Sequence, residues 1–272
     1  MKYWNKRLQK MTEYIPGEQP DNLNEFIKLN TNENPFPPSS AVLDALQKAC
    51  NGDLRRYPNP NAQMVRELFA KKNSLAADNV FVANGSDEIF TLLFRGFIEP
   101  DGIAAFPYPS YALYYTMAEA NGIAYDKITL DDNFDIPFDE FLKKKYNLVI
   151  IANPNNPTGK GVPIDQIKKF CSKFKGLLVV DEAYVDFYNE TAMPLVKEFD
   201  NIVITRSFSK SYSLAGLRVG LAIAHKEIIH GFIKLKDSYN VDRIAQAGAY
   251  AALLDDKGFK YNISMVRNNK EY

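Results

Sequence analysis

The sequence predicts an α/β protein of the three-layer sandwich type, with a mostly parallel sheet of about seven strands covered by helices on both faces. Two observations lead to this prediction. Short apolar runs such as Leu148–Ala152 and Leu177–Asp181 show no alternation of apolar and polar residues, which is typical of strands buried on both faces. Segments with helical periodicity separate these runs, as in the apolar stripe formed by Ile164, Ile167 and Cys171.

Composition limits the class of protein. Of the 272 residues, 46% are hydrophobic, which is enough for a sizeable core in one large domain or two small ones. Lys plus Arg and Asp plus Glu both number 33, so the net charge gives no general attraction for nucleic acid or an anionic membrane. The N-terminus lacks the apolar segment of a signal peptide, and no apolar run is long enough to span a bilayer.

The cysteines and histidines argue against a metal site. Cys50 and Cys171 lack the spacing of metal ligands, and we expect both to be buried as small hydrophobic residues. Only two histidines are present, His225 and His230, which argues against a histidine-based metal site or catalytic triad. Such cysteine usage fits a reducing compartment, so we expect a cytoplasmic protein.

The N-terminal third begins without a clear domain. Residues 1–33 are polar and rich in turn-forming residues, and we expect an arm. A loop with three prolines follows over 31–38, after which Ser40 is expected to cap a helix over 41–49. A further helix is expected over 62–72.

Strands and helices alternate along the rest of the chain. Strands are expected at 80–83, 103–106, 124–128, 148–152, 177–181, 201–205 and 219–224. Helices are expected from Ser86 onward, over 110–121, around Ile167, and over 226–236 and 243–254. Residues 255–272 have the character of another long helix.

One loop combines an amine, hydroxyl groups and a guanidinium. The expected strand at 201–205 leads to Ser207, Ser209 and Lys210, and Arg218 follows eight residues later. An amine can form a Schiff base with a carbonyl, while hydroxyls and a guanidinium can bind a phosphate. Pyridoxal phosphate (PLP) carries both groups. Taken alone, the segment is also compatible with a serine-rich surface loop.

Other polar residues fall at the expected ends of strands, where ligands bind in sheets of this kind. In Asn84-Gly-Ser-Asp87, Gly85 allows close approach of a ligand, and Ser86 and Asp87 lie at a helix N-terminus, which favours phosphate. The ordinary alternative for this motif is a capped turn between a strand and a helix.

Four residues could contact the ring of PLP. Asp181 could pair with the pyridine nitrogen, and Tyr184 could hydrogen-bond the phenolic oxygen. Asn156, in a loop with two prolines and a glycine, is a further donor, and Tyr111 could stack on the ring. Each residue has a structural alternative as a turn former, a helix cap or an interior aromatic. Together, these motifs supply the contacts that one ligand needs.

On these residues the chain resembles the fold-type I PLP-dependent aminotransferases, and within them it is most similar to the histidinol-phosphate aminotransferases. The resemblance covers residues 10–272 and is carried by the motifs at 14–20, 29–35, 56–58, 83–88, 155–159, 180–184 and 207–218. It implies the fold of aspartate aminotransferase, with residues 1–33 as an arm, 34–254 as the large PLP-binding domain and 255–272 as the incomplete start of a small C-terminal domain.

The resemblance also assigns roles to individual residues. It implies that Lys210 carries PLP and moves a proton between the substrate and the cofactor. It implies a homodimer in which Tyr57 of one subunit reaches the phosphate of PLP in the other. Tyr14, Asn32 and Asn156 are implied to lie near the substrate, with Tyr14 at its phosphate end.

The implied reaction transfers an amino group between L-histidinol phosphate and 2-oxoglutarate, in histidine biosynthesis. Threonine-phosphate decarboxylase and aromatic-amino-acid aminotransferase remain as alternatives, since related enzymes share the lysine and aspartate motifs. A non-catalytic PLP-binding fragment is an alternative of another kind. Family members bind the carboxylate of glutamate with an arginine beyond the position of Tyr272, and Arg267 is not placed by motif to replace it.

Overall fold

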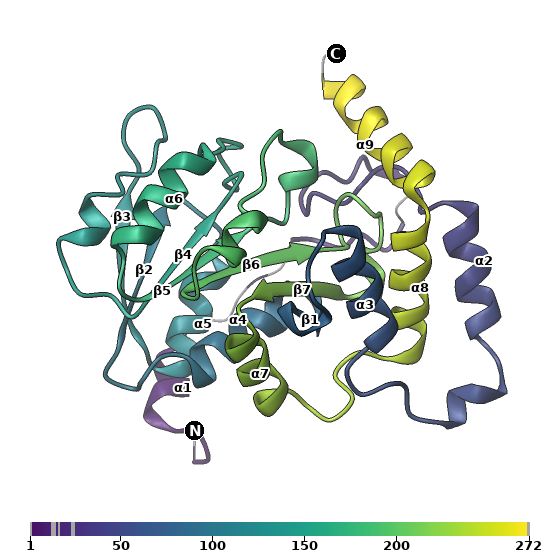
Figure 1. The fold of residues 1–272 in the computed structure, drawn as a ribbon, viewed down its shortest axis with the longest axis horizontal. Helices are drawn as coiled ribbons and strands as arrows, with labels where there is room; N and C mark the ends of the chain where they lie inside the picture. The colour runs from purple at the N-terminus through teal and green to yellow at the C-terminus, as the bar shows by residue number, and fades with distance from the viewer. Residues whose placement is uncertain (1, 12–14, 16, 23–24, 271–272) are drawn as a thin grey trace.

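The computed structural model describes the chain except residues 1, 12–14, 16, 23–24 and 271–272. A seven-stranded sheet with the order β1-β7-β6-β5-β4-β2-β3 lies at its centre (Figure 1). The strands are β1 (Val80–Asn84), β2 (Ile103–Tyr108), β3 (Ala124–Thr129), β4 (Leu148–Ala152), β5 (Leu177–Asp181), β6 (Ile202–Ser207) and β7 (Val219–Ala224). Strands β3, β2, β4, β5 and β6 run parallel, and β7 is antiparallel to both β6 and β1. The predicted mostly parallel sheet is confirmed.

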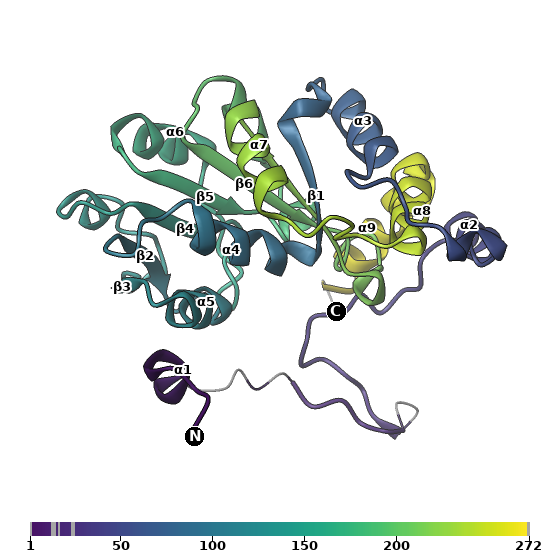
Figure 2. The same cartoon turned by 90° about the horizontal axis from the view of Figure 1, so that it is seen from below.

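Helices cover both faces of the sheet (Figures 1 and 2). The α-helices are α1 (Lys6–Lys10), α2 (Ser40–Ala49), α3 (Gln63–Lys72), α4 (Gly85–Gly96), α5 (Leu113–Asn121), α6 (Ile164–Lys173), α7 (Lys226–Leu235), α8 (Arg243–Leu254) and α9 (Asp256–Lys270). Short 3₁₀ helices span Gly52–Arg55, Ala77–Asn79, Glu140–Leu142, Val185–Phe187, Met193–Lys197 and Ala215–Leu217. Buried residues of α4, α5 and α7 belong to one apolar cluster, and those of α3, α6 and α8 belong to the other. The three-layer arrangement is therefore confirmed.

The middle strands explain why the sequence lacks apolar–polar alternation. On β5, Leu178 and Val180 belong to one apolar cluster, while Val179 between them belongs to the other. All three side chains are fully buried. Because both faces of the strand meet helices, apolar residues are favoured at every position, and each large one contributes about 1.5–3 kcal/mol by its burial.

Several expected boundaries shift by a few residues. The cap of α2 is Ser39 and not Ser40, since the Ser39 hydroxyl accepts from the backbone N–H of Val42 at 3.4 Å. The helix expected from Ser110 begins only at Leu113. The carbonyl of Ser110 instead accepts a hydrogen bond from the hydroxyl of Tyr115, which holds this stretch outside the helix.

The expectation of two buried cysteines was half right. Cys171 is buried on α6, whereas Cys50 is exposed. Cys50 follows the last residue of α2, where the chain turns away from the face that packs on α8.

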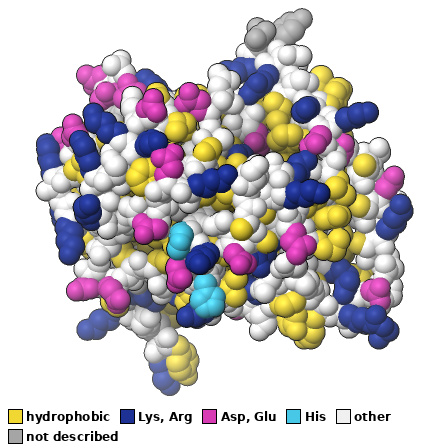
Figure 3. All heavy atoms as spheres, in the orientation of Figure 1, with side chains coloured by type: hydrophobic (Ala, Val, Ile, Leu, Met, Phe, Trp, Pro, Cys, Tyr) yellow, Lys and Arg dark blue, Asp and Glu magenta, His cyan; other side chains and the backbone are white. Residues whose placement is uncertain are grey.

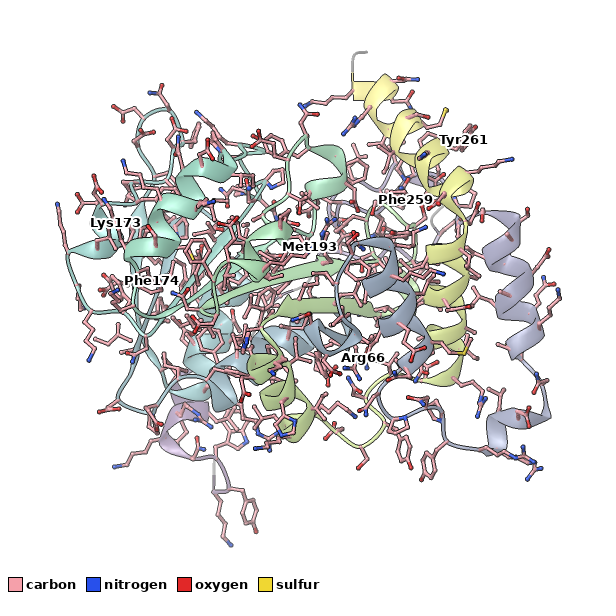
Figure 4. All side chains as sticks on the ribbon, in the orientation of Figure 1. Arg66, Lys173, Phe174, Met193, Phe259 and Tyr261 are labelled. Atoms are coloured by element: carbon pink, nitrogen blue, oxygen red, sulfur yellow. The ribbon has the colours of Figure 1, made fainter. Side chains whose placement is uncertain are left out.

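The first and last helices, α1 and α9, lie outside the sheet (Figure 2). In the described part of residues 1–33, the only α-helix is α1. At the other end, Phe259 lies on α9, as Figure 4 shows. Its ring stacks on that of Tyr212, with ring centroids 4.4 Å apart. Tyr212 in turn stacks on Phe208 at 4.7 Å, so α9 packs against the loop that carries Lys210.

The surface shows no large region of a single charge on the face seen in Figure 3, where acidic and basic side chains are interspersed. None of the described helices is long and apolar enough to cross a membrane. Within the described part of the chain, no group of three or more His, Cys, Asp or Glu residues is arranged to hold a metal ion.

Candidate active site

A cavity of about 730 Å³ opens beyond the carboxyl ends of β4, β5 and β6. Of the residues predicted from the sequence, those that line it are Asn32, Ser86, Asp87, Tyr111, Asn156, Asp181, Tyr184, Ser207, Ser209, Lys210 and Arg218. A cavity of similar size, about 770 Å³, lies between α2, α3 and α8 and contains none of them. The chemistry of the side chains therefore selects the first cavity as the candidate site.

Two predicted residues in the described part of the chain, Gly85 and Tyr57, do not line this cavity. Gly85 immediately precedes Ser86, which does. Tyr57 is 76% exposed and stacks on Tyr239, with ring centroids 4.3 Å apart. Tyr14 lies outside the described residues, so its predicted place near the substrate stays a prediction.

Asp181 forms the floor of the cavity. Its Oδ2 accepts a hydrogen bond from the hydroxyl of Tyr114 at 2.6 Å, and its Oδ1 accepts from the hydroxyl of Thr205 at 2.9 Å and from the backbone N–H of Ala183 at 3.2 Å. Burial raises the pKa of the Asp181 carboxyl, and the hydrogen bonds from Tyr114 and Thr205 act in the opposite direction. The pKa of Tyr114 is well above its usual value because of burial and the neighbouring Asp181, which keeps its hydroxyl protonated as a donor.

Tyr114 and Thr205 were missed in the sequence, although each left a signal. Tyr114 lies three residues after Tyr111 on an expected helix, so both side chains can approach the same place. Thr205 ends the expected strand at 201–205, which lies beside that of Asp181, and the two residues are direct partners in the β5–β6 register. That register was not available before the order of the strands was known.

The Lys210 amine lies beneath the arm. Its Nζ donates to the carbonyl oxygens of Thr31 at 2.8 Å and Asn32 at 3.0 Å. The side chain of Asn34 donates to the carbonyl of Lys210 at 3.0 Å, and that of Asn32 donates to the hydroxyl of Tyr184 at 3.0 Å. Burial lowers the pKa of Lys210, because removal from water disfavours the charged amine.

Arg218 gathers the groups at the opposite side of the site. One of its NH2 hydrogens points to Oδ2 of Asp87, 3.1 Å away, and NH1 lies 3.5 Å from the hydroxyl of Ser209. Gly85 has a φ of 74°, and a Cβ at this position would lie 2.4 Å from NH2 of Arg218. The left-handed backbone favours glycine here, and a side chain would also displace the guanidinium of Arg218 from its present place.

The N-terminus of α4 faces the same group of side chains. The helix spans Gly85–Gly96, and Ser86 in its first turn lines the cavity together with Ser207 and Ser209. Unpaired backbone N–H groups and the helix dipole favour an anion at this place. The N-terminus of α4, the serine hydroxyls and the guanidinium of Arg218 thus form one group of hydrogen-bond donors that can bind an anion.

The loop after β4 is held by Asn155. Its side chain donates to the carbonyl of Pro109 and to the hydroxyl of Thr158, both at 3.1 Å, and accepts from the hydroxyl of Ser110 at 2.8 Å. The next residue, Asn156, lines the cavity. The loops after β2 and β4 are therefore joined beside the site.

The sequence of this chain matches a known family. A sequence model of the family "Aminotransferase class I and II" matches residues 24–271. Histidinol-phosphate aminotransferase of Clostridium beijerinckii is 44% identical over 274 residues, which cover 99% of this chain and 76% of the relative. Histidinol-phosphate aminotransferase 1 of Pseudomonas aeruginosa is 40% identical over 274 residues, covering 99% of this chain and 78% of that relative.

Solved structures show the same fold. Histidinol-phosphate aminotransferase of Sinorhizobium meliloti, in complex with pyridoxal-5'-phosphate, superposes with a TM-score of 0.89 at 23% identity, over 100% of this chain and 76% of that one. The chain thus spans about three quarters of the length of the proteins it matches. On the family match and the identity to its relatives, the chain belongs to the class I and II aminotransferases and, within them, to the histidinol-phosphate aminotransferases.

Proposed function

We propose that this chain is a PLP-dependent aminotransferase that converts L-histidinol phosphate and 2-oxoglutarate to imidazole-acetol phosphate and glutamate, in histidine biosynthesis. The observation that carries the proposal is the placement of the Lys210 amine and the buried Asp181 carboxylate in one cavity. The identity of 44% to a histidinol-phosphate aminotransferase supports the choice of substrate.

The residues present fit PLP. The cavity has a volume of about 730 Å³ and offers an amine, a carboxylate and a phosphate-binding set in separate regions. Because Gly85 has no side chain, the guanidinium of Arg218 can lie close to the N-terminus of α4, where a Cβ would occupy its place. When bound, PLP supplies an aldehyde that condenses with amines and a ring that withdraws electrons from the substrate.

Lys210 would bind the cofactor and move the proton. A lysine whose pKa is lowered has a larger fraction of neutral amine near neutral pH, which is the form that acts as a nucleophile and base. Its Nζ would take the proton from Cα of the substrate and transfer it to the cofactor. The arm carbonyls of Thr31 and Asn32 would hold the amine whenever it is not bound to PLP.

Asp181 would bind the ring nitrogen, and the ring oxygen would contact Tyr184 and Asn156. Tyr114 and Thr205 each donate to one oxygen of Asp181, so the orientation of the carboxylate is fixed. An ionised carboxylate beside the ring nitrogen favours the protonated ring, which is the stronger electron acceptor. Tyr111, at the cavity wall, would stack on the ring.

The phosphate would bind at the N-terminus of α4. Ser86, Ser207 and Ser209 would donate hydroxyl hydrogen bonds, and Arg218 would supply a charged donor. Asp87, paired with Arg218, would orient the guanidinium toward this group. Burial raises the pKa of Asp87, and the charges of Arg218 and Lys210 act in the opposite direction.

Tyr57 would complete the phosphate site of a second subunit. Its side chain is exposed on the outside of this chain, and its carbonyl accepts from Arg243 at 3.1 Å. We include a homodimer and a cytoplasmic location in the proposal. Asn32, hydrogen-bonded to Tyr184 at the cavity, and Tyr14 would contact the substrate.

The proposal is tested with the purified chain and added PLP. Formation of glutamate from 2-oxoglutarate that depends on L-histidinol phosphate is the expected result. Release of CO₂ from threonine phosphate would indicate the decarboxylase instead, and formation of phenylpyruvate from phenylalanine would indicate the aromatic enzyme. A PLP spectrum without any turnover would identify a non-catalytic PLP-binding protein.

A further inference from the structure

A cluster of charged residues lies behind the candidate site, on the side of the sheet away from the cavity. On β6, Thr205 contacts Asp181 at the cavity floor, and the side chain of the next residue, Arg206, points to the opposite face. Arg206 is not among the residues that line the cavity, and its side chain is 16% exposed.

Arg206 contacts two carboxylates at once. Its Nε lies 2.9 Å from Oε2 of Glu182, as an ion pair without the alignment of a hydrogen bond, and its NH1 donates to Oδ1 of Asp186 at 2.8 Å. Glu182 is only 1% exposed and also accepts from the hydroxyl of Thr191 at 2.7 Å and the backbone N–H of Ala192 at 2.5 Å.

The second carboxylate connects this cluster to the lysine loop. Oδ1 of Asp186 accepts from Arg206, and its Oδ2 accepts from the hydroxyl of Ser211 at 2.5 Å. Ser211 directly follows Lys210 and is buried. One carboxylate thus joins the strand β6 to the residue next to the catalytic amine.

The same carboxylates belong to the loop that carries the ring-binding residues. Glu182 directly follows Asp181, and Asp186 lies two residues after Tyr184. The cluster therefore connects the Lys210 loop with the segment that carries Asp181 and Tyr184. A guanidinium suits this place because its NH1 donates to Asp186 while its Nε lies at ion-pair distance from Glu182, and the single nitrogen of a lysine amine cannot reach both carboxylates in this way.

We propose that Arg206, through Glu182 and Asp186, is a positioning residue that fixes the Lys210 loop against the loop of Asp181 and Tyr184. This inference rests on the proposed function, since it concerns how these residues meet PLP. The physical reason is that moving one partner of a buried ion pair leaves the other charge uncompensated, so the paired groups resist displacement. The cluster sets the place of the amine without touching the cofactor.

A merely structural cluster would stabilise the fold and leave the cavity unchanged. A positioning cluster instead sets how the amine of Lys210 meets PLP, and two measurements report this. One is the dissociation constant of PLP, and the other is the pH titration of the visible absorbance of the PLP–lysine adduct. Thermal stability, measured in parallel, separates the two roles.

Ser211→Ala is the first test, since it removes one hydroxyl and leaves the ion pairs in place. Ser172→Ala is its control, because that hydroxyl, on α6, donates only to the carbonyl of Lys169. We expect Ser211→Ala to weaken PLP binding roughly tenfold, as for the loss of a hydrogen bond to a charged group, and to shift the titration. The control is expected to keep the wild-type values of both.

Arg206→Lys is the second test. Lysine keeps the charge but cannot contact Glu182 and Asp186 in the same way, so we expect the same direction of change in PLP binding and in the titration. Because both variants break one chain of contacts, their effects on PLP binding in the double variant are expected to be less than additive.

Wild-type affinity and wild-type titration in Ser211→Ala would overturn the inference, and so would an equal shift in Ser172→Ala. This outcome is distinct from failure of the proposed function. If the wild-type chain itself formed no PLP–lysine absorbance, the assignment of Lys210 would be wrong before any variant was compared.

Discussion

The hydroxyl of Tyr114 lies 2.6 Å from Oδ2 of Asp181, and both side chains are buried at the floor of the candidate site. This contact joins α5 to the end of β5 through two residues that are 67 positions apart in the chain. It gives the carboxylate one fixed orientation, because Thr205 binds its other oxygen.

Tyr114→Phe is expected to weaken PLP binding. The change removes a donor to a buried carboxylate, which typically costs about 1.5–3 kcal/mol, or roughly ten- to hundredfold in the dissociation constant. The measurement is a PLP titration followed by absorbance. Tyr146→Phe is a matched control. The Tyr146 hydroxyl also donates to a carboxylate, that of Asp126 at 2.7 Å, and neither residue lines the cavity. Equal effects of the two changes would contradict the role of Tyr114.

Lys210→Ala is expected to abolish covalent attachment of PLP. Borohydride treatment of the wild-type chain with PLP should leave a pyridoxyl group on Lys210, located by peptide mass mapping, since a Schiff base to lysine is reduced to a stable amine. The variant should carry none and lose turnover. Lys160→Ala, which removes an amine paired with Asp135, should keep the adduct. An adduct on another lysine in the wild-type chain would refute the assignment.

Gly85→Ala is expected to weaken phosphate binding. The new Cβ would lie 2.4 Å from NH2 of Arg218 and would displace the guanidinium, and the left-handed backbone adds about 1–2 kcal/mol of strain. The dissociation constant of PLP and the melting temperature are measured together. Gly122→Ala is the control, because Gly122 has a similar φ of 71° and faces only the flexible side chain of Arg7. The melting temperatures should fall in both variants, and PLP affinity only in Gly85→Ala.

Tyr57→Phe is expected to raise the dissociation constant of PLP roughly fivefold. The reason is the loss of one hydrogen bond across the dimer, which costs about 1 kcal/mol of binding free energy. The ring would still stack on Tyr239, so the local fold is retained. Tyr261→Phe, on the exposed face of α9, is the control. An unchanged dissociation constant, with a dimer present by sedimentation, would rule out the contact between subunits.

The stability of the cofactor-free chain is expected to depend on Lys210 in a pH-dependent way. Burial lowers the pKa of Lys210 from its ordinary 10.5, so the unfolded chain binds more protons than the folded chain between the lowered pKa and 10.5. The free energy of unfolding contributed by Lys210 therefore rises with pH through this window. The difference in melting temperature between wild type and Lys210→Met should move in favour of the wild type as pH rises, and a constant difference would contradict the lowered pKa.

The architecture could be predicted because strands buried on both faces need apolar residues at every position. Apolar runs such as Leu148–Ala152 show this pattern, and the segments between them show helical periodicity. Boundaries were less certain, as at Ser110, where the hydroxyl of Tyr115 takes the carbonyl that a helix would use. A hydrogen bond from a side chain several residues away cannot be read from periodicity.

By itself, the sequence determined the fold class, the family and the residue types of the site, because glycine, lysine and aspartate at strand ends carry their chemistry locally. Only the tertiary structure decided which of them meet. The register of β5 against β6 set Thr205 beside Asp181, the packing of α5 brought Tyr114 to the same carboxylate, and the arm placed two carbonyls on Lys210. These contacts join residues far apart in the chain, and their partners are fixed by strand order and packing, which no local pattern encodes.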